Sequence, residues 1–331
     1  MAPERWAGRE VVVVDLDGAL APAGAGATGV AGEPGARPAV VAGVSTTPRL
    51  RRPPPYCDVV FSAAPDPPPP WVGDPSGRRL RALQAAVAAS PAAAVTLVQV
   101  LRVRGPVPLG GRLLTESLAF STLQGGPDFH RWLARTARPR RRDDARPAVE
   151  VSREGGELVV TLDRPQVCNA LNSAMRRQLV EALEVARVDP TVRRVSLRGR
   201  GPAFCAGGDL SEFGTAPDPV TAHLVRTAVS PAAALAGCAS RTVVTVHGPC
   251  VGAGVELAAF AGRVVARPGA TFRLPEVSMG LIPGAGGTVS IPRRVGRQRA
   301  VWLALSGEEL DAPTALAWGL VDEIAEVAGA G

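Results

Sequence analysis

The sequence predicts an α/β protein in which strands and helices alternate from residue 149 onward, preceded by an additional α/β region and a group of helices. Two observations lead to this prediction. Over the second half of the chain, apolar segments typical of strands alternate with amphipathic segments typical of helices. In the first half, short apolar runs change after Asp74 to a pattern with helical spacing. A chain of 331 residues with 46% hydrophobic residues is long enough for two domains or one large one.

Composition argues against several classes of protein. No run approaches the roughly 18 apolar residues that a membrane span needs. Residues 1–10 lack the apolar centre of a signal peptide, so we expect a cytoplasmic protein that is not bound to a membrane. The five cysteines form no CxxC pair, which favours buried thiols over a metal site or a disulfide framework.

The formal net charge is +7, and every basic residue other than histidine is arginine. The arginines are dispersed, and no aromatic platform or nucleic-acid-binding motif accompanies them. We therefore expect no nucleic-acid partner, and a small phosphorylated ligand fits the positive charge at least as well.

The first half of the chain divides by pattern into three parts. Strands are expected at 10–17, 38–45 and 56–63, separated by Gly/Ala-rich and Pro-rich segments, which gives an α/β region over 1–77. Helical spacing then continues through 78–89, 91–102, 113–123 and 128–137, which gives a helical region over 78–137. Residues 138–148 are charged and bounded by prolines, which indicates a linker.

The second region, 149–331, carries two glycine turns at expected strand ends. A strand at 158–162, a helix at 174–187 and a strand at 192–197 lead to the first turn, 203–210. A further strand at 242–246 leads to the second turn, which contains Gly252 and opens a short helix. Backbone N–H groups at such turns are unpaired, so they suit an anion or a developing negative charge.

Five motifs then resemble, in order and spacing, those of the crotonase superfamily, the enoyl-CoA hydratase/isomerase family. They are NALN at 169–172, AFCAGGDL at 203–210, VGAGVELA at 251–258, LPEVSMGLIPGAGG at 274–287 and AxxWGLVDEI at 315–324. The resemblance covers about 175 residues and implies the ClpP/crotonase spiral of β/α units for the second region, with the N-terminal α/β and helical regions added to it.

This resemblance also implies a substrate and a site. The substrate is a coenzyme A thioester, with no permanently bound cofactor and no metal. The positions that match the family's oxyanion hole are the backbone N–H groups of Gly208 and Ala253. The positions that match its coenzyme A contacts are Ala203, Phe204, Ala206 and Gly207.

Two glutamates match the acid/base pair of the family's hydratases. They are Glu256 and Glu276, 20 residues apart and both flanked by apolar residues. Two carboxyl groups held close in apolar surroundings favour sharing a proton, which suits proton transfer to and from a substrate. Their presence favours hydration of a 2-enoyl-CoA, while a double-bond isomerase and a non-catalytic acyl-CoA-binding subunit remain alternatives. For a single glutamate, a solvated side chain is the ordinary alternative.

The acyl pocket is expected along residues 213–229 and near the second glycine cluster. His223 and Arg226 are three residues apart, so they share a helix face and could recognise a polar group of the substrate. A helix face turned to solvent is the alternative. The pocket residues expected on this basis are Phe213, His223, Arg226, Pro283 and Gly284.

Family members continue at the C-terminus with helices that cover the site and support oligomers, commonly trimers or hexamers, so a homo-oligomer is expected. Here the counterpart of this helical lid is expected on the N-terminal side of the catalytic region, because residues 86–102 and 116–134 resemble those helices. Residues 11–17 likewise resemble 158–163, which makes 1–137 a shortened, degenerate copy of the crotonase unit. Its helices would complete the catalytic half, in the same chain or in a neighbouring one.

A competing motif lies at the end of the first strand. Asp15, Asp17 and Gly18 resemble the first motif of haloacid-dehalogenase-type phosphatases, in which an aspartate is the nucleophile and magnesium binds nearby. The chain has no lysine for the phosphate contact of that family, and the N-terminal strands leave little room for such a domain.

Overall fold

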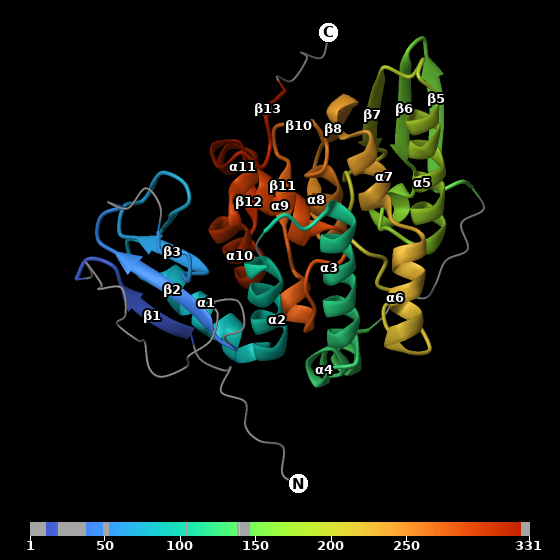
Figure 1. Cartoon of the computed structure of the whole chain (residues 1–331). Coiled ribbons are helices and arrows are strands. Elements are labelled where there is room, and N and C mark those ends of the chain that lie inside the picture. The colour runs from blue at the N-terminus through green and yellow to red at the C-terminus, as the bar shows by residue number, and fades with distance from the viewer. Residues whose placement is uncertain are drawn as a thin grey trace.

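The structure is a computed structural model that describes residues 11–18, 38–48, 53–103, 105–137, 139 and 146–325. The N-terminal sheet lies on one side of the molecule and the strands β5, β6 and β7 on the other, with helices from both halves between them (Figure 1).

The second half contains a six-stranded sheet and a small three-stranded sheet. The larger sheet has the order β13-β10-β8-β7-β6-β5 and is parallel except for the β5–β6 hairpin. Its strands are β5 (Val149–Glu154), β6 (Glu157–Leu162), β7 (Arg194–Gly199), β8 (Thr242–Val246), β10 (Arg263–Ala266) and β13 (Glu323–Ile324). The smaller sheet has the order β12-β11-β9, with β9 (Pro249–Val251), β11 (Thr271–Arg273) and β12 (Leu310–Asp311).

Helices cover this sheet, and their starts follow local sequence signals. Asn172 caps α5 (Ser173–Val188), since its side chain accepts a hydrogen bond from the backbone N–H of Met175. Leu179 and Leu183 follow Met175 at helical spacing and are buried with it against the core. The other helices of this half are α6 (Pro219–Ala228), α7 (Pro231–Gly237), α8 (Ala253–Ala258), α9 (Gly287–Val295), α10 (Arg297–Ser306), α11 (Ala312–Trp318) and the 3₁₀ turns η2 (Pro165–Val167), η3 (Ala239–Arg241) and η4 (Glu276–Met279).

The N-terminal strands form a separate parallel sheet of order β1-β2-β3-β4. The three predicted strands are confirmed as β1 (Val11–Asp15), β2 (Val40–Ser45) and β3 (Val59–Ser62), and the short β4 (Val72–Gly73) was not predicted. At the end of β1, the Asp17 carboxylate accepts hydrogen bonds from Ser45 Oγ (2.5 Å) and Thr46 N (2.6 Å). This aspartate therefore ties the ends of two neighbouring strands together.

Four helices follow, as predicted: α1 (Arg78–Ala89), α2 (Pro91–Arg102), α3 (Leu109–Gln124) and α4 (Pro127–Arg135). Helix α3 begins four residues before its predicted start, because two glycines weaken the helical pattern there. No single helix among the described residues is long and apolar enough to cross a membrane. Helices α1 and α2 reach that length and composition only together, across a 110° bend.

Buried arginines fasten the N-terminal sheet to the second half of the same chain. The Asp58 carboxylate is fully buried between Arg102 of α2 and Arg297 of α10. Arg299, also on α10, donates to the carbonyl oxygens of Trp71 and Pro67, both at 3.1 Å. The buried charge of Asp58 is tolerated because it is paired with both Arg102 and Arg297, which ties α2 and α10 to the same point of the N-terminal sheet.

Apolar side chains of the two halves belong to one continuous core, in which Val59 and Leu97 join Val255 and Trp302. The helices α1–α4 therefore cover the second half of their own chain. The division into domains at 77, 137 and 148 stays a prediction, and residues 138 and 140–145 of the expected linker lie outside the described residues.

Candidate active site

The two glycine turns meet in space although the chain separates them by more than forty residues. Cys205 and Cys250 pair as an isolated parallel bridge, and Val251 N donates to the Cys205 carbonyl at 2.9 Å. A Cβ atom placed on Gly207 would lie 3.2 Å from the carbonyl oxygen of Val251. Gly207 also has φ 95° and Gly252 has φ 49°, which are backbone conformations that favour glycine in both turns.

Each turn presents a backbone donor without an acceptor. Within the part of the chain that the structure describes, no hydrogen bond is donated by the N–H of Gly208 or by that of Ala253. Ala253 is the first residue of α8, so its N–H has no intrahelical acceptor. Two unpaired amide donors on adjoining turns are the element that stabilises a carbonyl oxygen as it gains negative charge.

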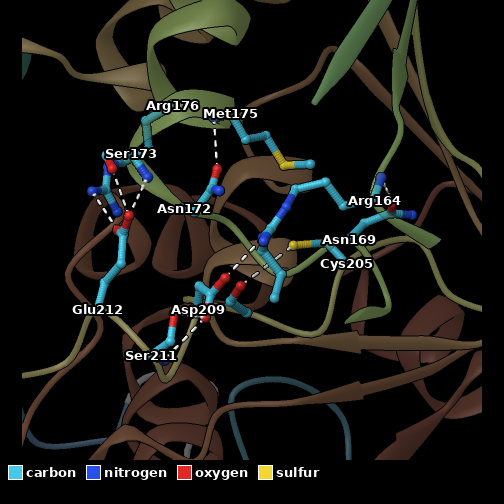
Figure 2. A network of polar contacts seen from close by, with 12 residues as sticks. Arg164, Asn169, Asn172, Ser173, Met175, Arg176, Cys205, Asp209, Ser211 and Glu212 are labelled. Atoms are coloured by element: carbon cyan, nitrogen blue, oxygen red, sulfur yellow. Dashed lines mark hydrogen bonds and ion pairs between the residues drawn. The ribbon is translucent and has the colours of Figure 1, made fainter. Parts of the chain in front are cut away.

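A buried ion pair fixes the loop that carries Gly208 (Figure 2). The Asp209 carboxylate pairs with Arg164 at 2.9 Å, and Arg164 is only 1% exposed. The same carboxylate accepts from Ser211 N (3.0 Å) and Ser211 Oγ (2.7 Å). Burial opposes the charge of Asp209, but the hydrogen bonds from Ser211 and Arg164 outweigh it and lower the pKa of this carboxyl.

Asn169 explains the predicted NALN motif. This residue has a left-handed backbone with φ 55°, which asparagine tolerates better than most residues. Its Nδ2 donates to the carbonyl oxygens of Arg200 and Ala203, both at 2.8 Å, and its Oδ1 accepts from Arg164 N at 2.8 Å. One side chain therefore joins the loop before α5 to the start of the Gly208 loop.

Glu256 lies on α8 and is 2% exposed. Its Oε2 accepts hydrogen bonds from the backbone N–H groups of Ala285 (2.6 Å) and Gly287 (2.8 Å). A Cβ atom on Gly287 would lie 2.6 Å from the Cγ of Glu256, so the glycine lets the backbone approach the carboxylate. The two donors lie 29 and 31 residues after Glu256 in the sequence, so a distant segment of the chain holds this side chain in place.

Glu276 opens η4 and is 9% exposed. A Cβ atom placed on Gly252 would lie only 2.4 Å from the Oε1 of Glu276, so a larger residue at 252 would displace this carboxylate. Its Oε2 is buried and has no hydrogen-bond partner among the described residues. An unpartnered carboxylate oxygen in such a place is available to a substrate or a water molecule.

The two carboxyls share an environment that disfavours charge. Burial, followed by repulsion from Glu276 and Glu116, raises the pKa of Glu256 well above its ordinary value. Burial raises the pKa of Glu276 to about 7. Both carboxyls therefore favour the neutral form, and a buried pair of this kind favours sharing a proton, which gives it one acid and one base.

A third buried carboxyl was missed as a site residue. Glu116 on α3 is 2% exposed and bonds to the turn that also holds Glu256. The sequence places it only in the helical region that resembles a lid. Its one local signal is a charged residue among apolar positions of a helix, which is common on solvated faces as well.

A cavity of about 300 Å³ lies next to the turn whose Ala285 amide bonds to Glu256, and Glu116 lines it, whereas Glu256 and Glu276 do not. Its walls come from α3, from the end of α6 with the start of α7, and from residues 284–286. Of the five predicted pocket residues, Arg226 and Gly284 line it, whereas Phe213, His223 and Pro283 do not.

Helix α3 packs on the face of α6 that carries His223 and Arg226, which was expected to contact substrate or solvent. His223 Nδ1 lies 3.0 Å from Ser117 Oγ, and Arg226 donates to Ser117 Oγ (2.9 Å) and Ser121 Oγ (3.0 Å). Both side chains are therefore engaged within the protein. Phe213 packs against Trp132 of α4 and under Gly208, where a Cβ would lie 2.8 Å from its ring.

The positions expected to contact coenzyme A differ in accessibility. Ala203, Phe204 and Gly207 are buried, and Ala206 is exposed. The Ala203 carbonyl already accepts the hydrogen bond from Asn169. Any contact of the first three with a ligand would have to be made by their backbone atoms.

Residues 152–328 match the family model described as Enoyl-CoA hydratase/isomerase, which is more than half of the chain. The chain belongs to this family. The match begins at residue 152, so the N-terminal sheet and α1–α4 lie outside it.

Curated relatives of this enoyl-CoA hydratase/isomerase family member carry names of both activities. The chain is 40% identical over 174 residues to the 2,3-dehydroadipyl-CoA hydratase of Escherichia coli (strain K12), covering 53% of this chain and 68% of that one. It is 37% identical over 177 residues to the 1,2-epoxyphenylacetyl-CoA isomerase of the same strain, covering 52% and 68%. The matches thus span about two thirds of each relative.

Solved structures show the same fold for the second half. An enoyl-CoA hydratase from Thermoplasma volcanium superposes with a TM-score of 0.50 at 33% identity, covering 55% of this chain and 73% of that one. An enoyl-CoA hydratase from Mycobacterium smegmatis does so with a TM-score of 0.50 at 32% identity, covering 54% and 70%. The predicted α/β crotonase fold with an added N-terminal α/β region is confirmed.

Proposed function

We propose that the protein is an enoyl-CoA hydratase, which adds water across the double bond of a 2-enoyl-CoA or removes it in the reverse direction. The observation that carries the proposal is the pair of buried glutamates, Glu256 and Glu276, both with raised pKa, together with the amides of Gly208 and Ala253, which have no acceptor among the described residues.

In this reaction the thioester carbonyl oxygen accepts hydrogen bonds from the N–H groups of Gly208 and Ala253. Attack on the β-carbon turns the thioester into an enolate, and the oxygen gains negative charge. Preorganised donors stabilise that charge by about 3 kcal/mol each, on the scale of other oxyanion holes.

The carboxyl pair moves two protons. The ionised member takes a proton from water as the water oxygen bonds to the β-carbon, and the protonated member gives its proton to the α-carbon. The protein thus ends with one proton on the pair, as at the start, and the substrate has gained one water molecule. Both transfers need carboxyls whose pKa lies near the working pH, which burial provides here.

Isomerisation of the double bond is the second candidate, and the unequal surroundings of the two glutamates favour it. Glu256 is held by two amide donors, whereas Glu276 Oε2 has no partner among the described residues. A single carboxylate with a free oxygen can carry a proton from one carbon to another through the same enolate. One relative at 37% identity is named as an isomerase.

The deciding experiment incubates the purified full-length protein with crotonyl-CoA and longer 2-enoyl-CoAs and follows the loss of the conjugated-thioester absorbance. Glu256→Gln and Glu276→Gln should each lower kcat by about 10²- to 10⁴-fold, the usual contribution of a general acid or base. Glu181→Gln on the exposed face of α5 is the matched control, and its kcat should equal that of the wild type.

Each other outcome changes the conclusion. If both variants turn over as fast as the wild type, the assigned roles are wrong. If the wild type hydrates no 2-enoyl-CoA but converts a 3-enoyl-CoA to the conjugated isomer, the protein is an isomerase. If it binds acyl-CoA and does neither, it is a binding subunit.

A further inference from the structure

Helix α3 contributes a buried carboxylate to the turn formed by residues 285–288. Glu116 Oε1 accepts a hydrogen bond from the backbone N–H of Gly286 at 2.7 Å. Glu116 Oε2 accepts from the backbone N–H of Thr288 at 2.9 Å and from its Oγ1 at 2.6 Å. Each oxygen of this carboxylate thus has a donor on the 285–288 turn.

The two remaining amides of this turn bond to the proposed acid/base pair. Ala285 and Gly287 both donate to Oε2 of Glu256. Successive amides of the 285–288 turn therefore alternate between the two carboxylates, with Glu116 on one side and Glu256 on the other.

Packing around Glu116 keeps the turn in this arrangement. Phe120, one helical turn later on α3, fills the space beside Gly284, where a Cβ atom would lie 2.3 Å from its ring. Arg226 of α6 lies over the Phe120 ring at 4.3 Å. A carboxylate and an aromatic ring from the same face of α3 therefore contact this turn and the residue before it.

Removing Glu116 would leave two amides without acceptors, since Gly286 is buried and Thr288 is half-buried. Buried unpaired amides cost enough that the backbone would rotate to find other partners. Because Ala285 and Gly287 alternate with them along the chain, that rotation would also move the donors of Glu256.

We propose that Glu116 is a positioning residue: it orders the 285–288 turn so that the Ala285 and Gly287 amides hold Glu256 in its catalytic geometry. The catalytic consequence rests on the proposed function, whereas the ordering of the turn does not. A helix from the N-terminal region, outside the residues that match the family, would thereby complete the site of the second half.

Charged groups from several elements face Glu116. They are Arg226 from α6, Glu256 from α8 and Glu276 from η4, and Arg176 from α5 lines the same cavity. Burial raises the pKa of Glu116 to about 7, against the hydrogen bonds of Thr288 and Gly286 and the charge of Arg226. Its charge in turn raises the pKa of Glu256 and of Glu276. Neutralising Glu116 should therefore move the acidic limb of the kcat profile to lower pH.

The test compares full-length wild type, Glu116→Gln and Leu123→Ala. Leu123 is 4% exposed on the same helix, so its truncation destabilises α3 without touching the turn's acceptors. Hydrogen exchange by mass spectrometry reports on the amides of 285–288, and crotonyl-CoA hydration reports on kcat and KM across pH.

Glu116→Gln should speed exchange in the 285–288 turn, lower kcat about 10- to 100-fold with little change in KM, and shift the acidic limb. Leu123→Ala should leave exchange in that turn and kcat near the wild type. Unchanged exchange in Glu116→Gln, or faster exchange with unchanged kcat, overturns the proposal. So does an equal loss of kcat in Leu123→Ala.

A second variant and a second measurement cover the cases in which Glu116→Gln does not fold or the wild type is inactive. If Glu116→Gln does not fold, Thr288→Val removes one donor to Glu116 and should raise exchange in the turn while lowering kcat more than KM changes. If the wild type hydrates no 2-enoyl-CoA, the proposed function fails, and the exchange comparison alone decides whether Glu116 orders the turn.

Discussion

A methyl group on Gly252 would lie 2.4 Å from Oε1 of Glu276, closer than non-bonded atoms approach. Gly252 has φ 49° and directly precedes the Ala253 amide at the start of α8. The backbone that offers one oxyanion donor is therefore also the surface on which a proposed acid/base residue rests. The two parts of the site are coupled through a residue that has no side chain.

Gly252→Ala should lower kcat by about 100-fold, because the added methyl displaces Glu276 from the substrate. It should also destabilise the fold by about 1–2 kcal/mol from its left-handed backbone alone. Gly269→Ala separates these effects, since Gly269 has φ 80° and open space around its Cβ position. This control should lose stability in denaturant titrations but keep its kcat. A Gly252→Ala enzyme with wild-type kcat would show that Glu276 is not seated by this turn.

The pH profile of kcat/KM should fall on its acidic side near pH 7. The pKa of Glu276 is about 7 and that of Glu256 is raised well above its ordinary value, so at lower pH both carboxyls favour the protonated form and the pair loses its base. Initial rates of crotonyl-CoA hydration from pH 5 to 9 measure this limb. A limb near the ordinary glutamate value of 4.5 would mean that neither carboxyl is desolvated as described.

Glu276→Gln should stabilise the protein at alkaline pH. Folding raises the pKa of Glu276 from 4.5 to about 7, so its contribution is present below pH 4.5 and lost as the pH rises through 7. Glutamine stays neutral, and the variant should exceed the wild type by up to about 3 kcal/mol at pH 8. Urea unfolding at pH 8 and pH 4 tests this, and the difference should nearly vanish at pH 4. A Glu276→Gln variant less stable than the wild type at pH 8 would contradict the prediction.

Asp209→Asn should reduce both stability and catalysis. The substitution leaves the buried Arg164 guanidinium without its carboxylate, which costs about 3 kcal/mol in comparable buried pairs. It also frees the loop that presents the neighbouring Gly208 amide, so kcat should fall while KM changes less. Glu184→Gln in the exposed pair with Arg187 serves as control and should change neither unfolding midpoint nor kcat.

A fragment of residues 146–331 should be poorly soluble and inactive. Without the N-terminal region it lacks Glu116 and Phe120, which contact the 285–288 turn and Gly284. It also lacks α4, whose backbone at Phe129 lies 2.6 Å from the Cβ position of Gly280 at the end of η4. Expression of the fragment, with solubility and crotonyl-CoA hydration measured, checks this. A soluble fragment with full activity would show that the N-terminal helices are dispensable.

Local pattern predicted the elements of the N-terminal region well, because their periods and proline boundaries are local signals. The positions of the glutamates and the two amide donors came from motifs whose order matches the family. Glu116 was missed as a site residue because its partners lie 170 and 172 residues away in the sequence. His223 and Arg226 were expected to meet substrate or solvent. Both side chains also bond to α3, more than 100 residues earlier, which the local pattern did not predict, and Arg226 lines the cavity as well.

The sequence by itself determined the family, the α/β class and the chemical groups of the site. Glycine turns and glutamates flanked by apolar residues are local patterns that short stretches of sequence contain. Only the tertiary structure decided how those groups are held. The helices of the first half cover the second half of the same chain. Glu116 and Glu256 accept hydrogen bonds from alternate amides of one turn. Long-range burial produces these contacts, and it also sets the raised pKa values of the buried carboxyls, which no local pattern records.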